Sequence, residues 1–180
     1  MPKLDPNRPF IAVRIAVLTV SDTRTPKEDK SGDTLAEMIA AAGHTVAARA
    51  IVKDDVEAIR AQVRVWIADA AIDVVVSTGG TGFTGRDVTP EAVRPLFEKE
   101  IDGFSAIFHM LSYDKVGTST IQSRACGGLA QGTYIFCLPG SPGACKDAWN
   151  GILVHQLDNR HRPCNLVEIM PRLEEHRRST

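Results

Sequence analysis

The stretch that decides the fold and the site spans residues 77–91 and reads Ser-Thr-Gly-Gly-Thr-Gly-Phe-Thr-Gly-Arg-Asp-Val-Thr-Pro-Glu. It follows the apolar run 74–76 directly and holds four glycines within seven positions: Gly79, Gly80, Gly82 and Gly85. Such a turn lets backbone N–H groups converge on an anionic oxygen without Cβ atoms in the way. Asp87 and the helix start at Pro90 then add a carboxylate and a helix N-terminus. The stretch predicts nucleotide or phosphoryl chemistry; a connector that serves only the fold is the alternative.

Short apolar strands alternate with helical segments along the rest of the chain. The spacing of apolar residues predicts strands over 13–20, 44–52, 74–76 and 133–138. It predicts helices over 31–42, 56–67 and 144–157, a short one from Pro90 and another from Phe104 to Tyr113. Strands that are apolar throughout and separated by amphipathic helices indicate an α/β fold with a parallel sheet covered on both faces.

Three unusual loops each follow a predicted strand, at residues 21–31, 77–91 and 139–143. Parallel strands bring their carboxyl ends to one edge of a sheet, and ligands collect outside that edge. We therefore expect the three loops to share one rim. The segment 12–170 is expected to form a single domain, preceded by a loose arm over 1–11 and followed by a charged tail over 171–180.

The bulk composition narrows the function further. The chain has 180 residues, 43% of them hydrophobic and 24% charged, and a formal net charge of −1. This charge argues against a nucleic-acid surface, which needs a clustered basic excess. No apolar run approaches the length of a membrane span, and Arg14 interrupts the only segment that resembles a signal peptide. These features predict a cytoplasmic protein without membrane or nucleic-acid partners.

Metal chemistry based on cysteine or histidine is not expected. The four cysteines show no C-x-x-C pair and are predicted to be reduced, buried small hydrophobes. His155, His161 and Cys164 lie close in sequence, but their spacing fits no common zinc template. We therefore expect no structural metal.

The candidate site residues are carboxylates and loop hydroxyls. Asp87 beside a phosphate cradle predicts a divalent cation between the two, although it can also serve the helix that starts at Pro90. Asp54 is likewise a metal-side carboxylate or a helix cap, a role that Asp55 can also fill. Ser141 offers a hydroxyl in a rigid frame of prolines or belongs to a plain turn. The first loop contributes further polar residues: Ser21, Asp22, Asp29 and Ser31, the last as a candidate helix cap.

Together these segments resemble the MoaB/MogA family of molybdopterin-binding proteins, and in particular its bacterial B branch. The matching segments run colinearly over about residues 12–170: 17–22, 29–32, 52–55, 78–82, 86–91, 123–125 and 138–142. The resemblance implies a three-layer α/β/α domain that assembles as a homotrimer or homohexamer. In related domains, an adenylyl group passes from Mg-ATP to molybdopterin with release of pyrophosphate, and a separate molybdate-insertion protein uses the product.

The resemblance also implies roles for individual residues. Asp54 and Asp87 would be the catalytic carboxylates and would hold the transient magnesium ion. The other implied positions would bind phosphate or pterin: Ser21, Asp22, Gly79, Gly80, Thr81, Gly82, Pro139, Gly140, Ser141 and Pro142. ATP is then a co-substrate, and molybdopterin is the ligand and substrate. The alternative within the family is a non-catalytic protein that binds or carries molybdopterin or its precursor.

Overall fold

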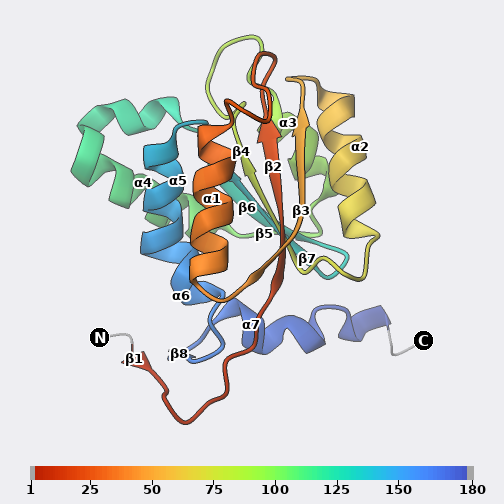
Figure 1. Cartoon of the computed structure of the whole chain (residues 1–180), viewed down its shortest axis with the longest axis vertical. Coiled ribbons are helices and arrows are strands. Elements are labelled where there is room, and N and C mark those ends of the chain that lie inside the picture. The colour runs from red at the N-terminus through yellow and green to blue at the C-terminus, as the bar shows by residue number, and fades with distance from the viewer. Residues whose placement is uncertain (1–2, 178–180) are drawn as a thin grey trace.

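The computed structural model describes residues 3–177 and has a six-stranded sheet at its centre (Figure 1). The strand order is β3-β2-β4-β7-β6-β5. The first four strands of that order run parallel, while β6 is antiparallel to both of its neighbours. The strands are β2 (Arg14–Val20), β3 (Thr45–Val52), β4 (Val74–Thr78), β5 (Lys99–Glu100), β6 (Cys126–Ala130) and β7 (Thr133–Leu138).

Helices cover both faces of this sheet, so the fold is the expected three-layer α/β/α domain. In Figure 1, α1, α4, α5 and α6 lie on one side and α2 and α3 on the other. The α-helices are α1 (Lys30–Ala41), α2 (Val56–Ile67), α3 (Thr89–Val93), α4 (Asp102–Val116), α5 (Pro142–Ala148), α6 (Val154–Gln156) and α7 (Leu166–Ile169). A π-helical turn, Trp149–Leu153, joins α5 to α6, and short 3-10 segments are η1 (Arg94–Leu96), η2 (Gly117–Gln122), η4 (Met170–Arg172) and η5 (Glu175–Arg177).

The central strands β2, β4 and β7 bury both of their faces, which explains the continuous apolar runs in the sequence, whereas the edge strands β3 and β5 keep exposed residues. In β2, Ile15 and Val17 pack under α1, whereas Ala16 and Leu18 pack under α2. A strand with one wet face would alternate apolar and polar residues instead. Leu35 of α1 and Ile59 of α2, among others, complete the two core layers with fully buried side chains.

Strand β6 was not predicted from the sequence. It forms a hairpin with β7 through Gln131 and Gly132, both of which have positive φ angles. The two glycines of β6 argued against a strand there, because glycine is unfavourable in strand interiors. Packing reverses that preference here, since a Cβ on Gly128 would lie 2.3 Å from the ring of Phe97.

The two ends of the described chain lie at the edge of the molecule opposite the glycine loop (Figure 1). Strand β1 (Lys3–Leu4) belongs to the predicted arm and pairs antiparallel with β8 (His161–Arg162). The described part of the predicted tail includes η5. Residues 1–2 and 178–180 lie outside the described residues.

Candidate functional site

The three loops meet at one edge of the sheet, as the strand directions require. Strands β2, β4 and β7 are adjacent and parallel, and the carbonyl of Leu138 accepts a hydrogen bond from the Gly79 amide at 3.0 Å. A hollow of about 440 Å³ lies between the loops. The polar hollow, as we call it, is lined by Val20, Ser21, Arg24, Asp54, Gly79, Gly80, Thr81, Gly82, Asp87, Gln122, Ser123, Pro139, Gly140 and Ser141.

Gly79 and Gly80 give the hollow its floor, and both positions require glycine. Their φ angles are +104° and +65°, values that other residues rarely adopt. A Cβ on Gly79 would lie 2.2 Å from the carbonyl oxygen of Val20. A Cβ on Gly80 would lie 2.4 Å from the Thr89 hydroxyl and 3.1 Å from an Asp54 carboxylate oxygen. The glycines therefore let the backbone approach both neighbouring loops.

The amides of the glycine loop are not equally available to a ligand. The Gly79 amide bonds to Leu138, and the Gly82 amide donates to the Asp87 carboxylate. The amides of Gly80 and Thr81 make no hydrogen bond within residues 3–177, and both residues line the polar hollow. Unpaired backbone donors that face a cavity are suited to an anionic oxygen. The predicted phosphate cradle is thus narrowed to these two amides.

Asp87 closes the glycine loop on itself. Its carboxylate accepts hydrogen bonds from the Thr84 amide at 2.9 Å and from the Thr84 hydroxyl at 2.6 Å. Burial would raise the pKa of Asp87, but these bonds, the Gly82 amide and the charge of Arg124 outweigh it and leave the pKa below its ordinary value. Asp87 does not cap α3, which has no side-chain cap. Asp87 is therefore held ionised beside the hollow.

Asp54 also lines the hollow, and its pKa is shifted in the direction opposite to that of Asp87. Burial raises its pKa, and the charges of Asp22 and Asp87 act in the same direction, so the pKa stands above its ordinary value. The helix cap of α2 is Asp55, which accepts from the Ala58 amide at 2.8 Å. This resolves the alternative that the sequence left open, and Asp54 has no capping role. Pairs of carboxylates whose pKa values are shifted in opposite directions are typical of functional sites.

Asp22 belongs to the wall of this site but not to the hollow itself. Its amide donates to the Asp54 carboxylate at 2.9 Å, and the Asp54 amide donates to Asp22 at 3.2 Å. Arg86 donates to both Asp22 carboxylate oxygens, at 2.9 and 2.8 Å, and these bonds hold the pKa of Asp22 below its ordinary value. Asp22 instead lines a second hollow of about 650 Å³, which shares Ser21 and Arg24 with the first.

The third loop supplies a helix N-terminus and a rigid corner. Ser141 caps α5 by accepting from the Ala144 amide at 3.2 Å, so it is more than a plain turn residue. Pro142 is the first residue of α5 and does not line the hollow, whereas Pro139 and Gly140 do. In the first loop the cap of α1 is Asp29, not Ser31, because Asp29 accepts from the Gly32 amide at 3.0 Å.

Val20 and three polar lining residues were not among the predicted site residues. Arg24 donates to the Gly140 carbonyl at 2.7 Å and also bonds the Ser31 hydroxyl, so it ties the first loop to the third. Gln122 and Ser123 reach the hollow from the end of η2. The position of Arg24 within a predicted rim loop could have indicated it, and Ser123 belongs to the segment 123–125 that matches the family; Gln122 had no such signal.

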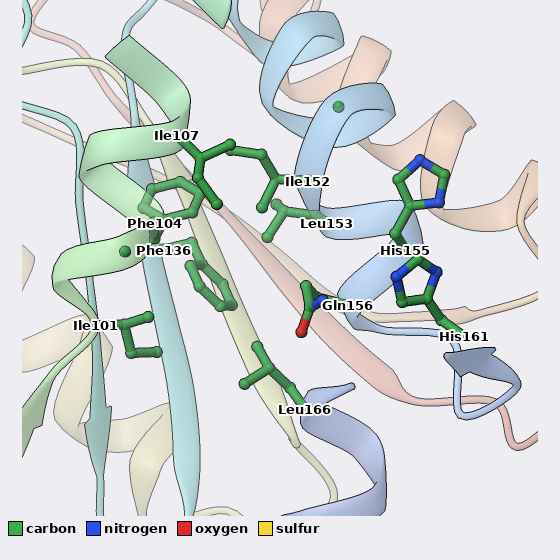
Figure 2. A pocket seen from close by; sticks show the side chains of 12 residues that line it. Ile101, Phe104, Ile107, Phe136, Ile152, Leu153, His155, Gln156, His161 and Leu166 are labelled. Atoms are coloured by element: carbon green, nitrogen blue, oxygen red, sulfur yellow. The ribbon is translucent and has the colours of Figure 1, made fainter. Parts of the chain in front are cut away.

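A separate apolar pocket of about 390 Å³ lies away from the three loops. Figure 2 shows Ile101, Phe104 and Phe136 facing Leu153 and Leu166 across it. His155 and His161 lie at its border with ring centroids 5.3 Å apart.

Within residues 3–177, no group of three or more His, Cys, Asp or Glu side chains could hold a metal ion. In the same range no helix is both long enough and apolar enough to cross a bilayer.

Comparisons with known proteins match most of the chain. Residues 16–159 match the family described as "Probable molybdopterin binding domain". The chain belongs to this family. It is 53% identical over 156 residues to molybdenum cofactor biosynthesis protein B of Escherichia coli K12, covering 87% of this chain and 92% of that protein. The namesake from Bacillus subtilis 168 is 47% identical over 146 residues, covering 81% and 86%.

The same fold is found among solved structures. A crystal structure of a molybdenum cofactor biosynthesis protein B is 42% identical in sequence and superposes with a TM-score of 0.83. The match covers 92% of this chain and 98% of that one. All residues that line the polar hollow fall inside the matched family region, residues 16–159.

Proposed function

We propose that this protein acts in molybdenum cofactor biosynthesis, binds molybdopterin in the polar hollow and transfers an adenylyl group to it from Mg-ATP. The observation that carries this proposal is the pairing of two unbonded amides, Gly80 and Thr81, with two carboxylates, Asp54 and Asp87, around one hollow. Membership in the family and the names of the relatives supply the substrate class.

The reaction suits a site without a protein nucleophile. A terminal phosphate oxygen of the pterin forms a bond to the α-phosphorus of ATP, and the bond from that phosphorus to the pyrophosphate oxygen breaks. Such phosphoryl chemistry depends on positioning and charge neutralisation. The Gly80 and Thr81 amides would donate to phosphate oxygens, and the N-terminus of α5 beyond Ser141 adds favourable potential. All five histidines lie outside the lining of the polar hollow, so proton transfer by imidazole is not invoked.

A magnesium ion fits the residues present. The pKa of Asp54 is raised first by burial and then by the negative charges of Asp22 and Asp87, and a divalent cation beside Asp54 would offset both effects. Magnesium is commonly bound by one or two carboxylates together with substrate phosphates, not by an all-protein cage. Asp54 and Asp87 would hold the ion that arrives with ATP, and the ion would neutralise charge on the phosphates.

We propose that the protein self-associates as a trimer or hexamer and delivers its product to a molybdate-insertion protein. Large apolar side chains on α4 and η2 support the first part. These side chains are 46–70% exposed: Ile107, Met110, Tyr113, Val116 and Ile121. Exposed apolar clusters of this size are typical of subunit interfaces.

The second candidate function is a non-catalytic carrier of molybdopterin or its precursor. The Thr84 and Gly82 bonds to Asp87 favour this function, because a carboxylate that already accepts hydrogen bonds from its own loop can have the structural role of stabilising that loop. The relatives of the B branch are also consistent with either role.

The test is pyrophosphate release from Mg-ATP in the presence of molybdopterin. The enzyme hypothesis expects release that requires both ligands and is lost in Asp87→Asn, while molybdopterin affinity falls little. Tight pterin binding without pyrophosphate release would support the carrier and overturn the enzyme.

A further inference from the structure

Arg124 makes four hydrogen bonds to the glycine loop and to the residues that follow it, and none of the roles proposed above explains them. Its backbone amide donates to the Thr81 carbonyl at 2.9 Å. Its guanidinium donates to the Gly82 carbonyl at 2.8 Å, to the Asp87 carbonyl at 2.8 Å and to the Glu91 carboxylate. One side chain therefore binds both ends of the loop that carries the carboxylate.

The guanidinium is anchored in the rigid part of the fold. Arg124 lies two residues before β6, whose five residues are all buried. Its side chain is 23% exposed and its guanidinium carbon lies 5.3 Å from the centroid of the Phe83 ring. A planar guanidinium fixes several acceptors at once in one geometry, which an ammonium cannot do. Arg124 thus connects the glycine loop to the sheet.

The carbonyl directions have a consequence for the donors. The N–H of a peptide points opposite to its C=O because the peptide is planar and trans. Since the Thr81 carbonyl faces the Arg124 amide, the Gly82 amide faces away from it, where the Asp87 carboxylate receives it. Fixing the Thr81 carbonyl therefore fixes the Gly82 amide and, through it, the Asp87 carboxylate. The carbonyls that belong to the same peptides as the Gly80 and Thr81 amides are held by Thr89 instead.

We propose that Arg124 is the positioning residue of the polar hollow, holding the glycine loop in the form that places the Asp87 carboxylate beside the hollow. This inference rests on the proposed function for its ligand but not for its loop geometry. Arg124 itself does not line the hollow and is not a catalytic residue.

Arg60 offers a matched control. Its guanidinium also donates to two backbone carbonyls, Glu91 and Ala92, each at 3.2 Å, and bonds the Glu57 carboxylate at 2.8 Å. Its side chain is 20% exposed. Arg60, on α2, therefore makes the same kinds of bonds as Arg124, but to α3, the helix that follows the glycine loop.

The experiment compares hydrogen exchange of the Gly82, Thr84 and Asp87 amides in wild type, Arg124→Gln, Arg124→Lys and Arg60→Gln. We expect exchange at these amides to rise about tenfold in Arg124→Gln, less in Arg124→Lys, and not in Arg60→Gln. The pKa of Asp87, followed by carboxyl ¹³C shifts, should rise in Arg124→Gln only. Equal exchange and equal Asp87 titration in Arg124→Gln and Arg60→Gln would overturn the proposal.

The two proposals fail in different ways. Hydrogen exchange needs no turnover, so a loosened loop in a protein that never releases pyrophosphate would leave Arg124 as a positioning residue and remove the enzyme hypothesis. If wild type is active, Arg124→Gln should lower kcat for pyrophosphate release about tenfold more than Arg60→Gln does, with little change in the KM for molybdopterin. Should Arg124→Gln not fold, the Arg124→Lys variant carries the same comparison, and wild-type exchange in it would overturn the proposal.

Discussion

The polar hollow and the apolar pocket have similar volumes, about 440 and 390 Å³, but are built in different ways. The polar hollow is made by backbone and short side chains that follow three parallel strand ends. The apolar pocket is made by large side chains such as Phe104 and Leu166, between elements that meet at the margin of the core (Figure 2). Only the lining of the polar hollow includes carboxylates, those of Asp54 and Asp87. Volume therefore does not identify the site, whereas the chemistry of the lining does.

The largest effect is expected when one carboxylate charge is removed from the polar hollow. Asp54→Asn is expected to lower the rate of adenylyl transfer by about 100-fold or more, because charge neutralisation at the phosphates contributes several kcal/mol. The measurement is pyrophosphate release under saturating Mg-ATP. Asp114→Asn, on the exposed surface of α4, serves as the control and should keep wild-type activity. Equal rates in both variants would contradict the assignment.

The backbone of the hollow can be tested separately from its charges. Gly80→Ala should cost about 1–3 kcal/mol in the free energy of unfolding, because its φ is positive and the new Cβ meets Thr89 and Asp54. Molybdopterin affinity should fall with it. Gly85→Ala lies in the same loop, yet its Cβ would have no atom within 4 Å. Urea denaturation and ligand titration of both variants check this; an equally damaging Gly85→Ala would count against the geometry.

The pH dependence of stability should report the raised pKa of Asp54. An acid whose folded pKa exceeds its unfolded value binds protons more readily in the folded state, so its ionisation destabilises the fold as the pH rises through that pKa. Asp54→Asn should therefore be more stable than wild type at pH 7, by about 0.5 kcal/mol. The difference should shrink as the pH falls below the Asp54 pKa. Urea unfolding from pH 4 to 8 measures it, and a less stable variant at pH 7 would be evidence for a structural Asp54.

The smallest effect is expected in the apolar pocket. Gly103→Ala adds a methyl group where no atom lies within 4 Å, so unfolding free energy should change by less than about 0.5 kcal/mol. Molybdopterin affinity, measured by calorimetry, should stay at the wild-type value. A loss of affinity as large as that of Gly80→Ala would move the ligand to the apolar pocket.

Much of the fold was predictable because its signals are local. The apolar runs of β2, β4 and β7 and the breaks after them fixed three parallel strand ends, and hence the common rim. Strand β6 was missed because its glycines are explained only by the distant ring of Phe97. Long-range packing of this kind leaves no periodic trace in a sequence.

The site was predicted in outline but not in detail. Residue types indicated the glycine loop and both carboxylates, but not which of Asp54 and Asp55 caps α2. Nor could they show that Asp87 occupies the Gly82 amide and leaves Gly80 and Thr81 unbonded. Those facts depend on backbone directions, which the folded chain sets after the loops meet.

The most direct test is an NMR titration that follows backbone amide shifts as molybdopterin is added. If the pterin phosphate binds in the polar hollow, the largest shifts should fall on the Gly80 and Thr81 amides. The Gly79 amide, bonded to Leu138, should move less. Shifts concentrated on Phe104 and His161, with Gly80 and Thr81 unmoved, would contradict the account.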